Sequence, residues 1–134
     1  MVRCELRVIY GDTDQMGVVY YANYLRWFEA GRTEFLRAKG LSYSEFEARE
    51  KLVLPVAEAG VNYLSPARYD DLVVVETSLA QARRASARFT YEVRRGPDLL
   101  ATGFTVHACV DATGRIRRLP EPFLAGMKVG ESVE

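Results

Sequence analysis

The hydrophobic positions of this 134-residue chain have a helical spacing near its N-terminal third and a strand-like spacing farther on. Over 24–40, large apolar side chains recur three and four positions apart, which predicts a long amphipathic helix. Gly31 lies in the middle of this helix, where glycine costs about 1 kcal/mol relative to alanine. We therefore expect the helix backbone to approach a sheet closely there. Ser42 and Glu45 have the spacing of a capping box and predict a short second helix over 43–51.

Strand-like segments precede and follow these helices in the sequence. Residues 3–10 alternate between apolar and polar side chains, which predicts a half-buried first strand. Residues 52–64 are β-rich but contain Pro55 and Gly60, which indicate an edge position and a bulge. We expect three further strands over 72–81, 86–94 and 99–110. A closing hairpin with a short last strand around Ile116 is expected over 111–116. The two prolines over 120–122 are expected to break regular structure, and the tail, 128–134, is expected to be loose.

This order of elements predicts one α+β domain over residues 1–134. Strands in series pair antiparallel, and a single long helix must bury its apolar face against their common face. We expect an antiparallel sheet of about five to six strands wrapped around one long central helix. Such a sheet leaves an edge exposed, and a second copy of the chain would cover the apolar run 53–64, so we expect a homo-oligomer.

Composition and charge narrow the class of protein. Eighteen basic and eighteen acidic residues give a formal net charge of zero, which argues against a nucleic-acid-binding protein. The sequence shows no signal peptide and no membrane-spanning apolar run, so we expect a cytoplasmic protein without membrane insertion. Cys4, Cys109 and the single histidine, His107, form no metal-ligand or Ser–His–Asp pattern, and we expect neither a metal nor another cofactor.

The candidate chemistry is concentrated in the acidic loop before the long helix. Asp12 and Asp14 directly follow the first strand, and Gly17 supplies a hinge at which positive φ carries no steric cost. The helix N-terminus that follows has unpaired N–H groups and can hold a developing oxyanion. A carboxylate beside such an end is the minimum needed for acyl transfer. Aspartates in loops also commonly form turns or cap helices without further function.

The residues of this loop carry a family resemblance. The pattern D-T-D-x-M-G-V-V-Y-Y-x-N-Y, followed by F-E-A-G-R, resembles the signature of the 4-hydroxybenzoyl-coenzyme A thioesterase family. It is especially similar to the short acyl-CoA thioesterases associated with the bacterial Tol–Pal system. The resemblance covers almost the whole chain, from Arg3 to about Pro122. It implies a hotdog fold, a catalytic role for Asp14 and an oxyanion site at the backbone amide of Tyr21, whereas Asp12 is expected to shape the loop.

A second cluster, Arg83, Arg84 and Ser86, lies where two predicted strands meet. An isolated Arg–Arg pair is usually a solvated corner, but the pattern R-R-x-S-x-x-F resembles the CoA-binding edge of the same family. Guanidinium groups suit nucleotide phosphates, and the serine hydroxyl can add a hydrogen bond. Glu29, in mid-helix, is the alternative catalytic carboxylate. His107 lies in an apolar strand and is expected to be structural.

The predicted function is hydrolysis of the thioester bond of acyl-CoA with a small to medium, aliphatic or aromatic acyl group. Asp14 either attacks the carbonyl carbon or activates water, and the residues leave both routes open. The alternatives are a non-catalytic acyl-CoA sensor, an interaction protein of the cell envelope, and a thioesterase acting on acyl carrier protein. The resemblance also implies a homodimer, or a homotetramer built from two dimers, with active sites at the boundary between subunits.

Overall fold

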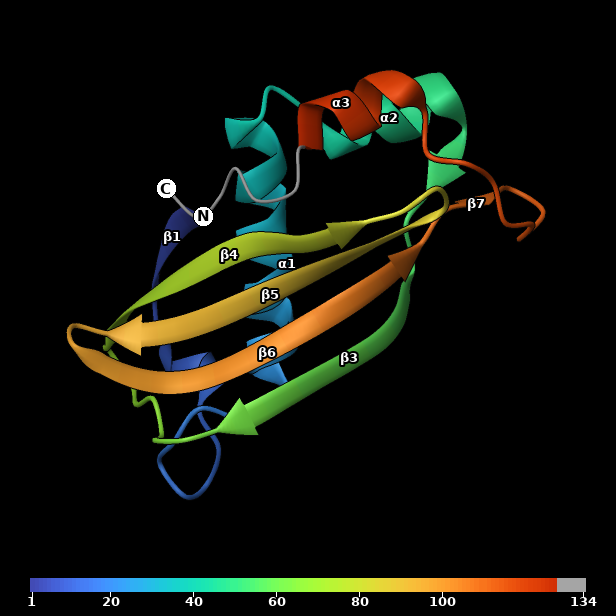
Figure 1. Cartoon of the computed structure of the whole chain (residues 1–134). Coiled ribbons are helices and arrows are strands. Elements are labelled where there is room, and N and C mark those ends of the chain that lie inside the picture. The colour runs from blue at the N-terminus through green and yellow to red at the C-terminus, as the bar shows by residue number, and fades with distance from the viewer. Residues whose placement is uncertain (128–134) are drawn as a thin grey trace.

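The computed structural model describes residues 1–127, which form a five-stranded antiparallel sheet with a long helix on one face (Figure 1). The strands lie in the order β1-β4-β5-β6-β3, and every neighbouring pair is antiparallel. A separate two-stranded ladder joins β2 to β7. The elements are β1 (Val2–Arg7), the 3-10 turn η1 (Tyr10–Asp12), α1 (Asn23–Ala38), α2 (Tyr43–Glu50), β2 (Leu52–Val53), β3 (Val56–Tyr63), β4 (Leu72–Ala82), β5 (Ser86–Arg95), β6 (Asp98–Ala108), β7 (Val110–Asp111) and α3 (Glu121–Met127).

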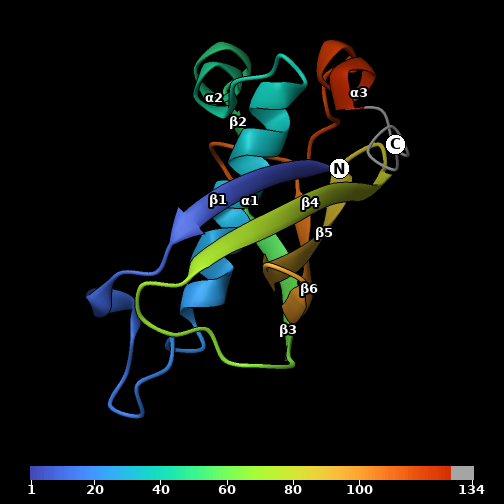
Figure 2. The same cartoon turned by 90° about the vertical axis from the view of Figure 1, so that its left-hand side faces the viewer.

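Helix α1 packs against β1, β4 and β5 (Figures 1 and 2). Its Phe28 side chain is fully buried and stacks on Tyr91 with the ring centroids 4.2 Å apart. Gly31 allows the helix to lie close to the sheet, because a Cβ atom there would be 2.4 Å from the Thr77 Oγ1 atom. The expected close approach at Gly31 is confirmed, and so is the predicted α+β architecture with its sheet against one long helix.

The sheet has an inner face toward α1 and an outer face away from it. Along β5, buried side chains alternate with half-buried ones, so that Ala87 and Phe89 face inward while Ser86 and Arg88 face outward. Among the described strands, β3 pairs with β6 alone, which leaves its other side as an open edge. The predicted edge position is therefore confirmed for β3.

The first strand is shorter than the predicted segment 3–10. β1 ends at Arg7, and Tyr10 begins the η1 turn instead of continuing the strand. The Asp12 carboxylate accepts a hydrogen bond from the Ile9 amide at 3.0 Å, which bends the chain out of the sheet. Such a side-chain bond to the backbone competes with strand pairing and leaves no trace in the alternation of apolar residues.

The segments 52–64 and 99–110 each form two strands instead of one. Pro55 has no N–H to donate to a ladder, and the chain leaves β2 before it and enters β3 after it. On the other segment, β6 ends and β7 begins around Cys109, whose amide donates to the Ala85 carbonyl at 3.0 Å. The two breaks lie together, because β2 pairs with β7 and β3 pairs with β6.

The bulge of β3 does not lie at Gly60, where the sequence predicts it. The irregularity of the β3–β6 ladder lies between Val56 and Glu58. Gly60 has a different function: a Cβ atom there would be 2.4 Å from Cε1 of the Phe104 ring. The glycine is thus needed for the cross-strand packing of an aromatic ring.

The C-terminal part of the described chain also differs from the prediction. Ile116 joins β7 through one isolated bridge and forms no strand. The prolines over 120–122 do not end regular structure, because α3 begins there with Pro122 in its first turn, where a missing N–H is tolerated. The Phe123 ring packs against Phe46 of α2 with the centroids 4.5 Å apart, which holds this helix in place.

The predicted loose tail, 128–134, lies outside the described residues. Within residues 1–127, none of the helices has both the length and the apolar character needed to cross a membrane.

Candidate active site

The loop between β1 and α1 holds Asp14 in a tight turn. The Oδ1 atom of Asp14 accepts hydrogen bonds from the amides of Met16 at 2.9 Å and Val18 at 3.5 Å. Gly17 adopts a φ of 79°, which suits glycine, and its amide donates to the Asp14 carbonyl at 3.0 Å. Within residues 1–127, the Asp14 Oδ2 atom has no hydrogen-bond partner. This oxygen is therefore available to a substrate or a water molecule.

Asp12, two positions earlier, is buried and holds the loop against α1. Its Oδ1 atom accepts from the Arg26 guanidinium at 2.8 Å, and its Oδ2 atom accepts from the Ile9 amide at 3.0 Å. Its carbonyl oxygen accepts from the Asn23 side chain and the Tyr20 amide, both at 2.8 Å. Asp12 thus shapes the loop, as expected, and both of its carboxylate oxygens are occupied.

The backbone just before α1 holds the candidate oxyanion donor, the Tyr21 amide. The helix begins at Asn23, and its N-cap, Ala22, has no side-chain acceptor. Within residues 1–127, the Tyr21 amide donates to no acceptor, while the Tyr21 carbonyl accepts a hydrogen bond from the Tyr63 hydroxyl at 2.8 Å. The Tyr21 N–H can therefore bind an anion at the positive end of the helix dipole.

Asp14 and Tyr21 line the same cavity, which has a volume of about 280 Å³. The Tyr24 and Tyr63 rings pack edge to face in its wall, with centroids 5.1 Å apart. Burial raises the pKa of both phenols, so each stays protonated at neutral pH. Asp14 is the one charged residue in a largely apolar lining, which consists of Asp14, Met16, Val18, Val19, Tyr21, Tyr24, Tyr63, Leu64, Ser65 and Pro66.

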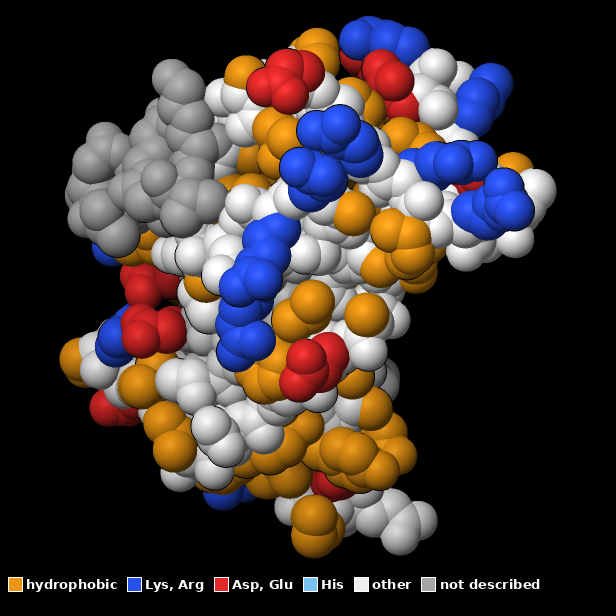
Figure 3. Space-filling model, turned by 45° about the vertical axis from the view of Figure 1, so that its right-hand side comes forward, with side chains coloured by type: hydrophobic (Ala, Val, Ile, Leu, Met, Phe, Trp, Pro, Cys, Tyr) orange, Lys and Arg blue, Asp and Glu red, His pale blue; other side chains and the backbone are white. Residues whose placement is uncertain are grey.

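The arginine cluster lies far from this cavity within one chain. Arg83 and Arg84 are exposed at the turn between β4 and β5, where the Arg83 amide donates to the Ser86 carbonyl at 2.8 Å. This turn and the Asp14 loop lie at opposite ends of the sheet (Figure 1). β5 runs between these two ends, and its ten residues span about 33 Å. In Figure 3, Lys and Arg side chains gather mainly on the upper part of the molecule, and hydrophobic side chains on the lower part.

Glu29, the alternative catalytic carboxylate, lies outside the Asp14 cavity. It is exposed in mid-α1 and lines a different cavity of about 230 Å³, together with Arg32 and His107. Residues 1–127 contain no group of three or more His, Cys, Asp or Glu side chains placed to hold a metal ion.

His107 belongs to a buried chain of hydrogen bonds that the sequence analysis did not reveal. Its Nδ1 atom lies 3.0 Å from the Leu54 carbonyl oxygen, and its Nε2 atom lies 2.9 Å from Thr105 Oγ1. Thr105 Oγ1 lies 2.6 Å from the Tyr91 hydroxyl. Because a carbonyl only accepts, Nδ1 carries the proton, Nε2 accepts from Thr105, and Thr105 accepts from Tyr91. His107 is therefore a neutral structural histidine, as expected.

Tyr63 is a site residue that the sequence analysis missed. It comes from the end of β3, and it meets Tyr21 only because the sheet brings that end beside the start of α1. The one signal available in the sequence was a tyrosine near the end of the predicted β-rich segment 52–64.

Comparisons with known proteins agree with this fold. Residues 8–127 match the model of the thioesterase-like superfamily. The chain is 36% identical over 106 residues to the acyl-CoA thioesterase YbgC of Haemophilus influenzae, which covers 79% of this chain and 78% of that protein. It is 35% identical over 130 residues to the acyl-CoA thioester hydrolase YbgC of Escherichia coli O6:H1, which covers 96% of each.

A solved structure gives the same result at the level of the fold. The crystal structure of the hypothetical protein TT1821 from Thermus thermophilus matches with a TM-score of 0.89 and 39% sequence identity, over 93% of this chain and 95% of that one. The family match includes the Asp14 loop, the start of α1 and the β4–β5 turn. This chain therefore belongs to the thioesterase-like superfamily and has the hotdog fold.

Proposed function

We propose that this chain hydrolyses acyl-CoA thioesters, with Asp14 as nucleophile or general base and the Tyr21 amide as oxyanion donor. The observation that carries the proposal is that, within residues 1–127, a carboxylate oxygen and a backbone N–H just before α1 both lack a hydrogen-bond partner and belong to residues lining one apolar cavity. The two YbgC relatives, one named as an acyl-CoA thioesterase and the other as an acyl-CoA thioester hydrolase, support the same reaction here. A cavity of about 280 Å³ suits a small to medium acyl group.

The two groups have separate tasks in this mechanism. As the thioester carbonyl becomes tetrahedral, its oxygen gains negative charge, which the Tyr21 N–H and the helix dipole stabilise. On one route, Asp14 attacks the carbonyl carbon, the carbon–sulfur bond breaks, CoA leaves as the thiolate, and water hydrolyses the resulting anhydride. On the other route, Asp14 takes a proton from a water molecule that attacks the same carbon. Both routes yield a free carboxylic acid and CoA.

We further propose that two copies of the chain share each site. Arg83, Arg84 and Ser86 are the proposed ligands of the CoA nucleotide, but the length of β5 alone exceeds that of the pantetheine arm that joins thioester and nucleotide. Val56, at one end of the open β3 edge, pairs with His107 near the arginine turn, while the other end of β3 lies beside Tyr21. Antiparallel pairing of two β3 strands would bring the Asp14 end of one copy to the arginine end of the other.

The test of the catalytic assignment is Asp14→Asn, which removes the charge and keeps the shape. We expect turnover to fall at least about a hundredfold, the scale for losing an acid–base or nucleophilic group, with a smaller change in substrate binding. Asp70→Asn is the matched control, because Asp70 is exposed and lies outside the cavity. Normal turnover of Asp14→Asn together with inactivity of Glu29→Gln would transfer the catalytic role to α1.

Two narrower assignments remain predictions: membership of the Tol–Pal-associated branch, and CoA instead of acyl carrier protein as the carrier of the acyl group. Membership of the Tol–Pal-associated branch predicts co-purification with cell-envelope proteins, and a tagged chain that recovers none of them would contradict it. Acyl carrier protein is the alternative donor of the same thioester, and relative kcat/KM for acyl-CoA and acyl carrier protein substrates distinguishes the two carriers. A non-catalytic sensor would bind acyl-CoA without hydrolysing it.

A further inference from the structure

A large hollow lies on the outer face of the sheet, away from the Asp14 cavity. Its volume is about 570 Å³, and outward side chains of neighbouring strands form its floor. Ser78, Thr90 and Phe104 lie side by side on β4, β5 and β6, while Asn62 of β3 pairs with Thr102 of β6. The lining of the hollow therefore includes hydroxyl and amide groups together with the aromatic ring of Phe104.

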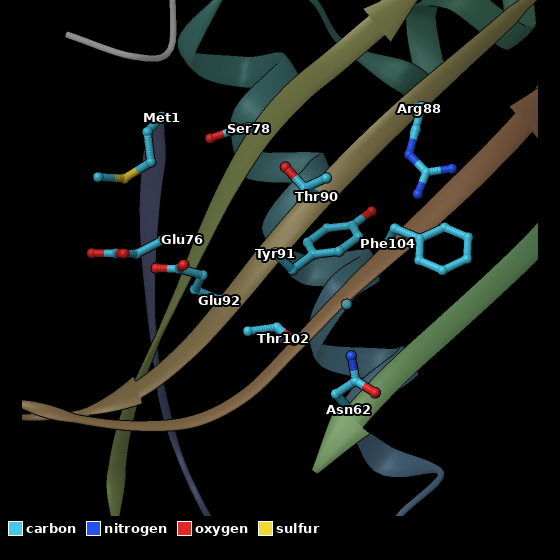
Figure 4. Close-up of a pocket in the computed structure, with 11 residues that line it drawn as sticks. Met1, Asn62, Glu76, Ser78, Arg88, Thr90, Tyr91, Glu92, Thr102 and Phe104 are labelled. Carbon is cyan, nitrogen blue, oxygen red and sulfur yellow. The ribbon is translucent and has the colours of Figure 1, made fainter. Parts of the chain in front are cut away.

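Arg88 and Phe104 form a stacked platform at one end of this hollow (Figure 4). The central guanidinium carbon of Arg88 lies 4.2 Å from the centroid of the Phe104 ring. Within residues 1–127, Arg88 pairs with no carboxylate. Because Gly60 has no side chain, the Phe104 ring can pack directly over its backbone. The platform thus has an unneutralised planar cation and an aromatic face at a half-buried position.

The carboxylates of the hollow do not neutralise this platform. Glu76 and Glu92 lie toward its other end in Figure 4 and are held by other arginines. Glu76 accepts from Arg3 at 2.9 Å and Arg94 at 3.3 Å, and Glu92 accepts from Arg94 at 2.8 Å. Burial acts to raise the pKa of Glu76, but the bonds from both arginines outweigh it and lower that pKa. The hollow therefore has a neutralised end and a cationic, aromatic end.

The cationic end continues into the proposed phosphate-binding turn. Arg88 and Ser86 are successive outward residues of β5, and Arg84 lies four positions before Arg88, or about 13 Å along an extended chain. A nucleotide bound with its phosphates at the turn can place its base on the outer face of the same strand. Planar bases stack on aromatic side chains and on guanidinium planes alike.

We infer that the hollow binds the adenosine part of CoA, with the adenine stacked on the Arg88–Phe104 platform and the ribose beside Thr90 and Ser78. This inference rests on the proposed acyl-CoA function, and it adds a base-binding site to the phosphate site at the β4–β5 turn. Arg88→Gln removes the cation, and Phe104→Leu removes the aromatic face while it keeps an apolar side chain over Gly60. Arg37→Gln is the matched control, since Arg37 lies at the end of α1 and pairs with Glu34.

Calorimetric titration with CoA and with adenosine 3′,5′-bisphosphate tests the site directly. In both variants we expect the affinity for each ligand to fall at least about fivefold, the lower range for one stacked base, while the control is unchanged. Hydrolysis of an acyl-N-acetylcysteamine thioester, which has no nucleotide, is expected to keep its kcat and KM. Binding of adenosine bisphosphate that depends on Arg88, in a protein that hydrolyses no thioester, would support this site and refute the proposed activity.

Two results would overturn the inference. One is an unchanged affinity for both ligands in both variants, or no nucleotide binding by the unmodified protein. The other is that the variants form smaller assemblies in sedimentation runs and bind CoA normally, which would make the hollow a contact between copies of the chain.

Discussion

Asp12 and Asp14 lie two positions apart in one loop and have contrasting environments. The Asp12 side chain is buried, and both of its oxygens accept hydrogen bonds. Asp14 is half-buried, and among the described residues only its Oδ1 atom is bonded. Hydrogen bonds to a carboxylate stabilise its charged form and weaken it as a base or nucleophile. The proposed mechanism uses the Oδ2 atom of Asp14, so replacement of Asp14 by Asn is the decisive test at the residue scale.

His107 supports a second prediction at the residue scale, which concerns how the free energy of unfolding depends on pH. Burial is the main cause of its lowered pKa, nearby Arg32 adds to it, and the hydrogen bond to the Leu54 carbonyl opposes it. Since the folded pKa lies below the unfolded value of about 6.5, neutral His107 contributes stability above about pH 6.5. That contribution is lost as the pH falls from there to the lowered folded pKa.

Urea unfolding at a series of pH values measures this effect. We expect the free energy of unfolding to decrease as the pH falls below about 6.5, with a slope of at most about 1.4 kcal/mol per pH unit, and His107→Gln to lack this slope. The lowered pKa values of Asp71 and Glu76 affect stability in a more acidic range and apply equally to both proteins. Equal slopes in the two proteins would contradict the prediction.

At the scale of elements, the β4–β5 turn is held rigidly enough to present its arginines. The turn is closed by the bond from the Arg83 amide to the Ser86 carbonyl, and the Arg84 carbonyl accepts from the Leu119 amide at 2.8 Å. A later segment thus fixes the turn, although Arg83 and Arg84 extend into solvent. A fixed backbone with exposed guanidinium groups suits recognition of phosphates at low cost in ordering.

The double variant Arg83→Ala and Arg84→Ala tests this element. We expect its KM for acyl-CoA to rise at least about tenfold with little change in kcat, because charge-assisted hydrogen bonds contribute about 1.5–3 kcal/mol each and lie far from the bond that breaks. Arg37→Ala with Arg49→Ala removes the same charge from helix positions paired with Glu34 and Glu45, and serves as control. An unchanged KM would make the turn a solvated surface.

At the scale of the whole molecule, the open edge of β3 is the feature that one chain leaves incomplete. The side chains at and just beyond the two ends of β3 are between 38% and 59% exposed, which is unfavourable for large apolar side chains in water; they are Val53, Val56, Tyr63 and Leu64. A second copy paired along this edge would cover them and would extend the sheet. The same pairing would join the Asp14 end of one copy to the arginine end of the other.

Mixing two defective variants tests the shared site. Asp14→Asn supplies intact arginines, and the Arg83→Ala, Arg84→Ala variant supplies an intact Asp14. If each site combines Asp14 of one copy with the arginines of the other, mixed dimers contain one complete site. We expect the mixture, after unfolding and refolding together, to recover acyl-CoA hydrolysis at low substrate concentration that neither variant has alone. No recovery despite dimers in light scattering, or an active monomer, would refute the shared geometry.

Local physical chemistry in the sequence determined the kinds of elements and much of their order. The apolar spacing over 24–40 predicted α1, and the Ser42–Glu45 spacing predicted the start of α2, where the Glu45 amide donates to the Ser42 hydroxyl at 3.4 Å, one of the two bonds of a capping box. Gly31 in a helix indicated a close helix–sheet contact, which exists. These features depend on side chains within one or two turns of each other, or on the average burial of one face, and both are visible in a linear pattern.

Contacts between segments that are distant in the sequence determined the hydrogen-bond partners and the relative positions of the site residues. The bonds that occupy Asp12 and leave Asp14 Oδ2 unpaired, the Tyr63 hydroxyl on Tyr21, and the packing of Phe104 over Gly60 all require the sheet to be assembled. The separation of Asp14 from the arginine turn also follows from strand order and strand length, which no local spacing encodes. Apolar periodicity reports which face of an element is buried, whereas hydrogen-bond partners are selected only when elements meet.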